Sequence, residues 1–253
     1  MNRHICILGA LREEINLIRR QMTVDKQFKI GQADGWTGNW KGTHIFLVRT
    51  GVGKVRALNG LKGVLRQANP SLILSIGYAG GLASKLNVGD VVLADNVLEV
   101  NSDLNDIGCY SIDSKELELL ERLTCSEKIV THRGKLITVD SVVDDSAIKQ
   151  ELASRYNALA IDMETAALVA LAAEKKITFL SVRSISDTYE QSLVDVSSFI
   201  DDGEVSKLKA GWYVITHPHA IKNFMSLRRQ SQRATRNMTE FIGIFLQTYQ
   251  NFA

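Results

Sequence analysis

Short apolar runs alternate with amphipathic segments along the first 190 residues of the chain. Runs such as His4–Leu8, Leu72–Ile76 and Thr178–Val182 are typical of strands that are buried on both faces of a sheet. Apolar residues at helical spacing predict helices over residues 11–22, 54–69, 115–124 and 145–157. This alternation of strands and helices predicts an α/β domain with helices on both faces of a largely parallel sheet.

The remaining segments give less regular patterns. Residues 28–50 predict two strands of a hairpin, arranged around Gly35 and Lys41-Gly42. Residues 91–94 predict a strand, 99–114 an irregular polar segment and 128–140 one or two strands. Gly77–Gly81 is expected to be a turn after the strand at Leu72–Ile76. Asp162 is a plausible N-cap of the next helix, which places Glu164 in its first turn.

Acidic or glycine-rich segments follow several of the predicted strands. They are Glu13-Glu14, Gly77–Gly81, Asp140-Ser141 and Asp187. Ligands of open α/β sheets collect at the carboxyl ends of the strands, so these segments are candidates for one shared site. Each acid alone also has a structural explanation: helix capping for Asp162 and Glu164, an Asx-turn for Asp187, and a solvated helix face for Glu14.

Composition narrows the class of partner. The chain has 253 residues, of which 45% are hydrophobic, and this is enough for one large core. A net charge of +2 without a basic cluster in the middle of the chain argues against nucleic acid or a membrane as the main partner. The three cysteines lack metal-ligand spacing, and the N-terminus lacks the apolar stretch of an export signal. We therefore expect a cytoplasmic protein with reduced thiols, no metal and no cofactor.

The segment Gly51-Val52-Gly53-Lys54 is not a nucleotide-binding loop. A P-loop needs Gly at the position of Val48 and Ser or Thr at the position of Val55. The dinucleotide fingerprint fails because Arg56 occupies its third glycine position. The segment predicts a strand-to-helix turn, whose free N–H groups can also hold an anion or a ribosyl hydroxyl.

Seven ordered motifs carry a family resemblance that no single one of them would support. They are Ile5–Glu14, Thr50–Val55, Gly77–Leu82, Val88–Val92, Asp140–Val143, Asp162–Glu164 and Arg183–Asp187. Over residues 3–190 the sequence resembles the nucleoside phosphorylase superfamily, and it is most similar to the methylthioadenosine/S-adenosylhomocysteine nucleosidase branch. The resemblance implies a nucleoside phosphorylase-like, three-layer α/β/α fold with a largely parallel or mixed central sheet. It also implies cleavage of a purine nucleoside by a homodimer or a higher homo-oligomer.

The resemblance implies a role for each candidate residue. Glu14 would activate a water for attack at the anomeric carbon, and Asp187 would protonate the purine N7 or share a proton with it. Glu164 would hold the ribose hydroxyls. The other implied substrate-binding residues are Met163, Tyr78, Ala79, Gly80, Val142, Val143 and Ser186. These roles suit the chemistry, since breaking a ribosyl C–N bond places positive charge on the sugar and negative charge on the base.

The same resemblance leaves hydrolysis and phosphorolysis to be distinguished. The phosphorylase branch has an arginine before the glycine segment and a Gly-Asp-Pro signature in the early loop. This chain has Ser75-Ile76 and Glu13-Glu14 instead, which favours a hydrolase that releases adenine from a 5′-substituted adenosine, including one with a bulky 5′ group. A phosphate-dependent purine nucleoside phosphorylase is the alternative, and Arg12 and Arg49 are cations that can serve phosphate. A non-catalytic nucleoside-binding protein is the alternative of another class; it would be expected to lack Glu14 or Asp187.

The C-terminal part of the chain differs in composition from the rest. We expect residues 1–200 to form the catalytic domain and residues 201–253 to form a basic helical extension packed on the same domain. The apolar residues of this extension fall at helical spacing, at positions 234, 238, 241, 242 and 245. Contact of its basic face with a membrane or lipid is possible but not favoured. His217 and His219 lack a third ligand nearby, which argues against a metal site.

Overall fold

The computed structural model describes residues 4–123, 129–191, 200–201, 204–205 and 220–252. The strands are β1 (Ile5–Gly9), β2 (Thr23–Ile30), β3 (Ala33–Trp40), β4 (Thr43–Arg49), β5 (Leu72–Gly81), β6 (Val91–Val100), β7 (Asp106–Ser111), β8 (Thr131–Thr138), β9 (Ala160–Asp162), β10 (Thr178–Asp187), β11 (Ile200–Asp201) and β12 (Glu204–Val205). The helices are α1 (Arg12–Gln21), α2 (Lys54–Leu65), α3 (Lys115–Arg122), α4 (Ser146–Tyr156), α5 (Thr165–Glu174) and α7 (Ala220–Phe252).

The central sheet is mixed. Its strand order is β10-β6-β8-β9-β5-β1-β4-β3-β2, and β7 pairs with β6 off this path. The strand β1 lies parallel to both β4 and β5, and all five of its residues are buried. The hairpins β2–β3 and β3–β4 and the pairs β10–β6 and β5–β9 are antiparallel. The expectation of a largely parallel or mixed α/β sheet is therefore confirmed.

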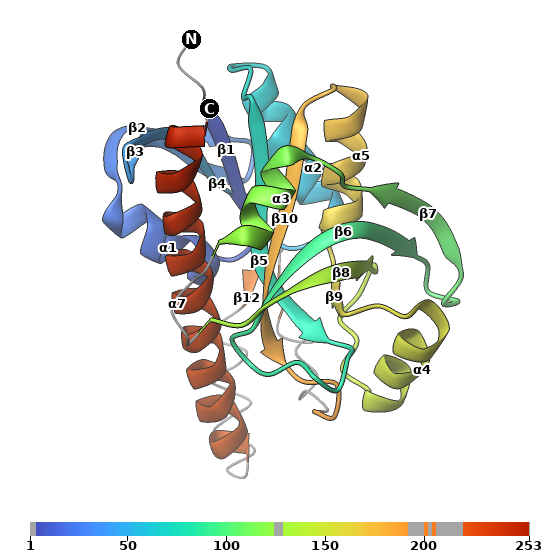
Figure 1. Ribbon diagram of the computed structural model, residues 1–253. Coiled ribbons are helices and arrows are strands. Elements are labelled where there is room, and N and C mark those ends of the chain that lie inside the picture. The colour runs from blue at the N-terminus through green and yellow to red at the C-terminus, as the bar shows by residue number, and fades with distance from the viewer. Residues whose placement is uncertain (1–3, 124–128, 192–199, 202–203, 206–219, 253) are drawn as a thin grey trace.

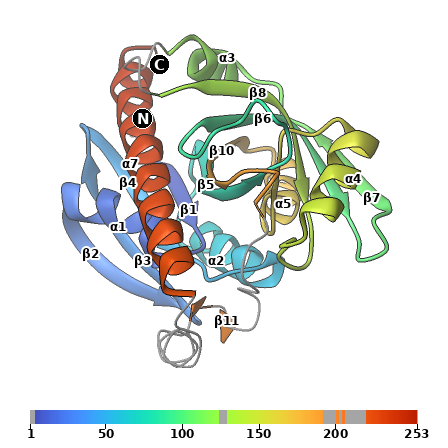
Figure 2. The same cartoon turned by 90° about the horizontal axis from the view of Figure 1, so that it is seen from below.

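One half of the sheet closes on itself. Besides its neighbours along the path, β10 also pairs in parallel with β5. The strands β5, β10, β6, β8 and β9 therefore form a closed ring, which Figure 2 shows from below. Register shifts interrupt β10 between Ile185 and Asp187 and β6 between Ala94 and Asn96, and such bulges let long strands bend.

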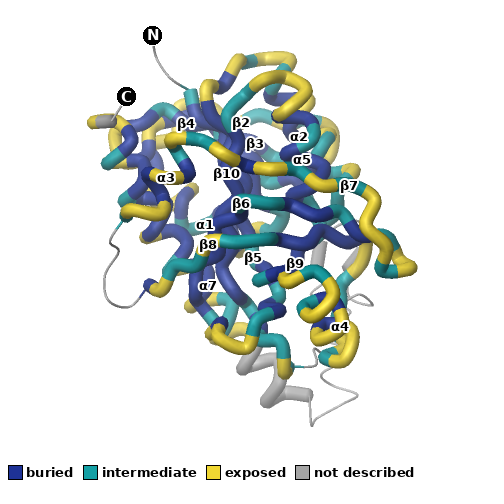
Figure 3. The backbone as a smooth tube through the Cα atoms, turned by 45° about the vertical axis from the view of Figure 1, so that its right-hand side comes forward, coloured by how far each residue is buried: buried dark blue, intermediate teal, exposed yellow. Residues whose placement is uncertain are grey.

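Helices cover both faces of the sheet. The helices α2 and α5 pack against each other on one face, whereas α1 and α7 pack together on the other (Figure 1). Figure 3 shows the buried strands running through the centre, with exposed residues on the surrounding helices and turns. The apolar side chains of α7 at positions 234, 238, 241, 242 and 245 are fully buried against the core. No helix among the described residues combines the length and the apolarity needed to cross a membrane.

Most of the predicted elements are confirmed, with the differences concentrated in polar strands. The Lys41-Gly42 turn joins β3 to β4, and both residues have positive φ, at 53° and 81°, as a tight two-residue hairpin turn requires. The strand β2 was not predicted because it is an exposed edge strand with charged residues in place of alternation. Gly35 lies within β3, where a Cβ would come 2.2 Å from the ring of Phe28 on β2.

Three further predictions were wrong. Gly77–Gly81 is not a turn but the second half of β5, which pairs with β10 as far as Gly80 and with β9 at Gly80 and Gly81. The segment expected to be irregular contains the end of β6 and all of β7. The helix α5 begins at Thr165, so that Glu164 rather than Asp162 is its N-cap residue. In each case pairing with a neighbouring strand or with a distant side chain decides the backbone, and local propensity does not report it.

A buried ion pair joins the elements beneath the carboxyl ends of the strands. Arg183 of β10 donates to Asp162 of β9 from Nε at 2.8 Å, and its Nη2 lies 2.8 Å from the same carboxylate. The same guanidinium donates to the hydroxyls of Ser75 on β5 at 2.8 Å and Thr165 on α5 at 2.6 Å. Asp162 also accepts from Thr138 of β8 at 2.7 Å. Four strands and one helix thus meet at one charge pair.

Removal of the guanidinium should destabilise the whole domain. In Arg183→Leu the buried Asp162 carboxylate loses its compensating charge, so we expect the free energy of unfolding to fall by about 3–5 kcal/mol. Urea denaturation at neutral pH measures this change. Arg133→Leu is the matched control, because Arg133 pairs with Glu121 and Asp95 at the surface and its loss should cost less than about 1 kcal/mol. Equal losses in the two variants would contradict a special role for the buried pair.

Candidate active site

Glu14 is held by two backbone N–H groups from different elements. It occupies the third position of α1, from which a glutamate can reach back to the residue before the helix. Its carboxylate accepts from the N–H of Leu11 at 2.8 Å and from that of Tyr78 on β5 at 2.9 Å. Burial raises the pKa of Glu14, while the two N–H groups and the nearby Arg183 oppose this shift. The result is a buried carboxylate of increased basicity.

Glu164 lies at the start of α5 and faces the glycine turn before α2. Its Oε1 accepts from the N–H of Gly53 at 2.8 Å. Gly53 has φ +98°, a backbone conformation that residues with a side chain rarely adopt. One N–H group at the start of α2 is therefore occupied by a carboxyl oxygen of the protein itself. Although Glu164 is only partly buried in terms of accessible surface, desolvation and then the charge of Asp162 raise its pKa to about 8.

Asp187 ends β10 and is buried. Its Oδ2 accepts from the Lys149 ammonium of α4 at 2.6 Å, and its Oδ1 accepts from the Ser186 hydroxyl at 2.7 Å. Gly80 on β5 lies directly beside it, since a Cβ at that position would come 3.2 Å from Oδ2. Asp187 therefore lies against β5, as Glu14 does.

The strand β5 is the common wall of the site. Tyr78 contacts Glu14 through its N–H, and the carbonyl of Ala79 accepts from Ser186 at 3.4 Å. Tyr78 and Gly80 are two residues apart, about 7 Å along a strand. A similar separation of carboxyl groups leaves room for a water in inverting glycosidases. The described structure thus brings together Glu14, Asp187, Tyr78, Ala79, Gly80 and Ser186.

The other predicted substrate-binding residues lie at the margin of this group. Met163 is partly buried between β9 and α5, next to Glu164 in the chain. Val142 and Val143 lie between β8 and α4, and Val143 packs on a small apolar cluster that includes Leu82 and Leu152. No measured contact joins these three residues to Glu14 or Asp187, so their contact with a substrate stays a prediction.

Two cations of the site were not assigned from the sequence. Arg183 was part of a motif, but its contact with Asp162 joins residues far apart in the chain. Lys149 gave a readable signal, because it shares one face of α4 with Leu152, Ala153 and Tyr156. A lysine on the apolar face of a helix must find a buried partner. Lys54 also has carboxylate partners that were not predicted, because its ammonium lies 2.6 Å from both Glu99 and Asp140.

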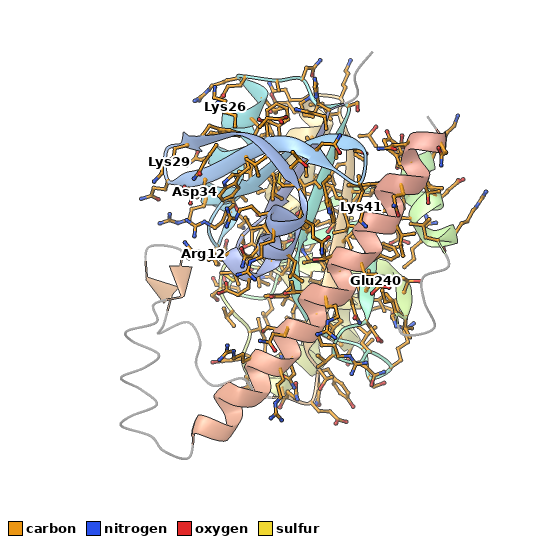
Figure 4. All side chains as sticks on the ribbon, turned by 90° about the vertical axis from the view of Figure 1, so that its left-hand side faces the viewer. Arg12, Lys26, Lys29, Asp34, Lys41 and Glu240 are labelled. Atoms are coloured by element: carbon orange, nitrogen blue, oxygen red, sulfur yellow. The ribbon has the colours of Figure 1, made fainter. Side chains whose placement is uncertain are left out.

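The two arginines proposed for phosphate do not join the carboxylates. Arg12 and Arg49 line a cavity of about 350 Å³ formed by α1 and the strands β2–β4, together with Asp34 and Trp36. Figure 4 labels Arg12 and Asp34 on this face of the molecule. Arg49 forms an ion pair with Asp34.

The described residues contain no group of three or more His, Cys, Asp or Glu side chains that could hold a metal ion. His217 and His219 lie outside the described residues. The site is therefore characterised by its carboxylates, its backbone N–H groups and two paired cations.

The chain matches a known protein family and a curated relative. The Phosphorylase superfamily model matches residues 4–210. The chain is 27% identical over 229 residues to the 5′-methylthioadenosine/S-adenosylhomocysteine nucleosidase of Bacillus subtilis (strain 168). The alignment covers 85% of this chain and 99% of that protein.

Solved structures with low sequence identity share the fold. S-adenosylhomocysteine nucleosidase from Streptococcus pyogenes, in complex with 5-methylthiotubericidin, has a TM-score of 0.76 at 21% identity and covers 98% of this chain and 97% of that one. Futalosine hydrolase of Helicobacter pylori strain 26695 has a TM-score of 0.77 at 20% identity, covering 98% and 99%.

The raised pKa of Glu164 has a consequence for stability. A carboxyl with a pKa of about 8 when folded and about 4.3 when unfolded keeps its proton longer in the native state. Between these values the native state binds more protons, so its free energy of unfolding falls as the pH rises, by at most about 1.4 kcal/mol per pH unit. We therefore expect Glu164→Gln to become more stable relative to the wild type between about pH 5 and pH 8.

Urea denaturation of both proteins across this range measures the difference. Glu151→Gln, at an exposed position of α4, is the control and should follow the wild type. A constant difference between Glu164→Gln and the wild type would show that the pKa of Glu164 is not raised.

Proposed function

The chain belongs to the phosphorylase superfamily, and from this premise we propose that it is a purine nucleosidase, which hydrolyses the N-glycosidic bond of a 5′-substituted adenosine and releases adenine. The observation that carries the proposal is the Glu14 carboxylate, buried between the N–H groups of Leu11 and Tyr78. A fixed carboxylate with a raised pKa is suited to take a proton from water.

The other two carboxylates divide the remaining work. As the ribosyl C–N bond breaks, its electron pair moves to the purine, and Asp187 supplies or shares the proton that N7 takes up. Glu164 binds the ribose hydroxyls, and in its protonated form it can donate as well as accept a hydrogen bond. Met163 packs against the sugar, and Val142 and Val143 border the base.

The partners that the arginines already have support hydrolysis over phosphorolysis. A phosphate dianion beneath the ribose would need an available cation. Among the described residues, Arg183 is the arginine whose charge acts on the carboxylates Glu14 and Glu164. Its guanidinium is already hydrogen-bonded to Asp162, Ser75 and Thr165. Arg12 and Arg49 line the cavity beside α1, where Arg49 is paired with Asp34.

The 5′ substituent is open between two classes. The curated relative is named for methylthioadenosine and S-adenosylhomocysteine, whereas one structural neighbour is named for futalosine. We also propose that residues 1–200 form the catalytic domain, that residues 201–253 form an extension of it, and that the protein acts in the cytoplasm as a homodimer or higher homo-oligomer.

Adenine release tests the function directly. Incubation with methylthioadenosine, S-adenosylhomocysteine, inosine and adenosine, each with and without phosphate, should give phosphate-independent release from a 5′-substituted adenosine. Phosphate-dependent release would identify a phosphorylase, and binding without release would identify a nucleoside-binding protein.

A pair of neighbouring variants tests the water-activating residue. Glu14→Gln keeps the size of the side chain but removes the base, so we expect kcat to fall by about 10²–10⁴-fold. Glu13→Gln is the matched control, because Glu13 is exposed on the same turn and should keep nearly full activity. If both variants kept wild-type kcat, Glu14 would not be the base.

A further inference from the structure

Lys149 is a charged residue at a position where a helix normally places an apolar one. Its side chain is 0% exposed, and it lies on the inner face of α4 with Leu152. Burial of an ammonium is costly unless a carboxylate and hydrogen bonds compensate it. Such a residue therefore needs an explanation in terms of what it holds.

The contacts of Lys149 all involve the end of β10 and the turn after it. The ammonium donates to Asp187 Oδ2 at 2.6 Å, to the carbonyl of Gln191 at 2.9 Å and, at the longer distance of 3.5 Å, to the carbonyl of Thr188. An ammonium has three N–H donors, so these three acceptors match its full capacity. The turn itself is closed by reciprocal contacts between Thr188 and Gln191.

Charged and titratable groups around the pair are few in the described part of the chain. Lys149 is the cation within ion-pair distance of Asp187. On β5, Gly80 borders the carboxylate, and the nearby Tyr78 directs its phenol to Thr235 instead. Beyond β10, Tyr189 and Glu190 pair with each other at the surface. Among the described residues, Lys149 is therefore the charged group that contacts the Asp187 carboxylate.

We propose that Lys149 is a positioning residue that holds Asp187 in place for proton transfer and stabilises the carboxylate that remains once the proton has gone. The inference rests on the proposed nucleosidase function and adds a residue to it. Lys149 donates to Oδ2 and Ser186 donates to Oδ1, and these two hydrogen bonds fix the orientation of the carboxyl group. One lone pair of Oδ1 stays available to the purine.

The proton balance explains why a cation helps. When the ribosyl C–N bond breaks, the purine gains an electron pair and takes a proton at N7, and Asp187 changes from an acid to its conjugate base. The Lys149 ammonium lies 2.6 Å from Oδ2 and so stands beside the carboxylate that this transfer leaves. Its contacts are with Asp187 and the turn after β10, so its role is to position Asp187 and not to transfer the proton itself.

The test compares a lysine of α4, Lys149, with a lysine that contacts the end of α4, Lys135. Lys149→Met removes the charge with little change in side-chain length, and we expect kcat to fall about 10- to 100-fold while KM changes little, a part of the about 10²–10⁴-fold effect of a general acid. Lys135→Met is the control: Lys135 donates to the carbonyl of Tyr156, and its loss should leave kcat and KM unchanged.

A double variant separates positioning from folding. Lys149→Met leaves a buried carboxylate uncompensated and can unfold the protein, whereas Lys149→Met combined with Asp187→Asn removes both charges. If Lys149 acts through Asp187, the double variant should have the same residual kcat as Asp187→Asn alone. A further loss in the double variant, or wild-type kcat in Lys149→Met, would overturn the proposal.

The wild type keeps this outcome distinct from the proposed function. If the wild type and Lys135→Met release no adenine from any nucleoside offered, the nucleosidase proposal fails. If they release adenine and Lys149→Met matches them in kcat, only the role of Lys149 fails.

Discussion

The cost of burying carboxylates is the constraint on which this structure depends. Four of them, Glu14, Asp162, Glu164 and Asp187, lie near the carboxyl ends of the central strands, where little water remains to solvate them. Asp162 is compensated by Arg183, and this pair connects β5, β8, β9, β10 and α5. The ion pair therefore holds together the strands and the helix around which the other three carboxylates lie.

The remaining carboxylates are compensated in different ways, and this gives them different chemistry. Glu14 has two backbone N–H groups and the more distant Arg183, so it can be ionised and still basic. Glu164 has a single N–H and the repulsion of Asp162, which favours its protonated form. Asp187 has a full cation at 2.6 Å. These different surroundings suit the three roles that are proposed for one type of side chain, namely a base, a ribose-binding group and an acid.

The sequence predicted the apolar framework of the fold better than its polar edges. The strand β1 and the helices α1 and α4 could be located because their apolar spacing is set by burial in the core. The second halves of β5 and β10 could not, because Gly77–Gly81 and Ser184–Asp187 are strands through pairing with each other and with β9 and β6, which are distant in the sequence. Glu14 and Asp187 were found through family motifs, whereas the position of Lys149 on the apolar face of α4 indicates that it needs a buried partner but not that Asp187 of β10 is that partner.

The helix α7, which lies outside the family motifs, also contacts residues that hold the site. The phenol of Tyr78 is bonded to the hydroxyl of Thr235 on α7, and burial together with the charge of Glu14 raises the pKa of that phenol, which keeps it protonated. The N–H of Tyr78 meanwhile holds Glu14. One residue of β5 therefore links the C-terminal helix to the carboxylate that is proposed to activate water. The hydroxyl of Thr235 also lies 3.4 Å from the carbonyl of Glu13, the residue before Glu14. The helix α7 therefore contacts both Tyr78 and the start of α1, and it is part of the support of the site.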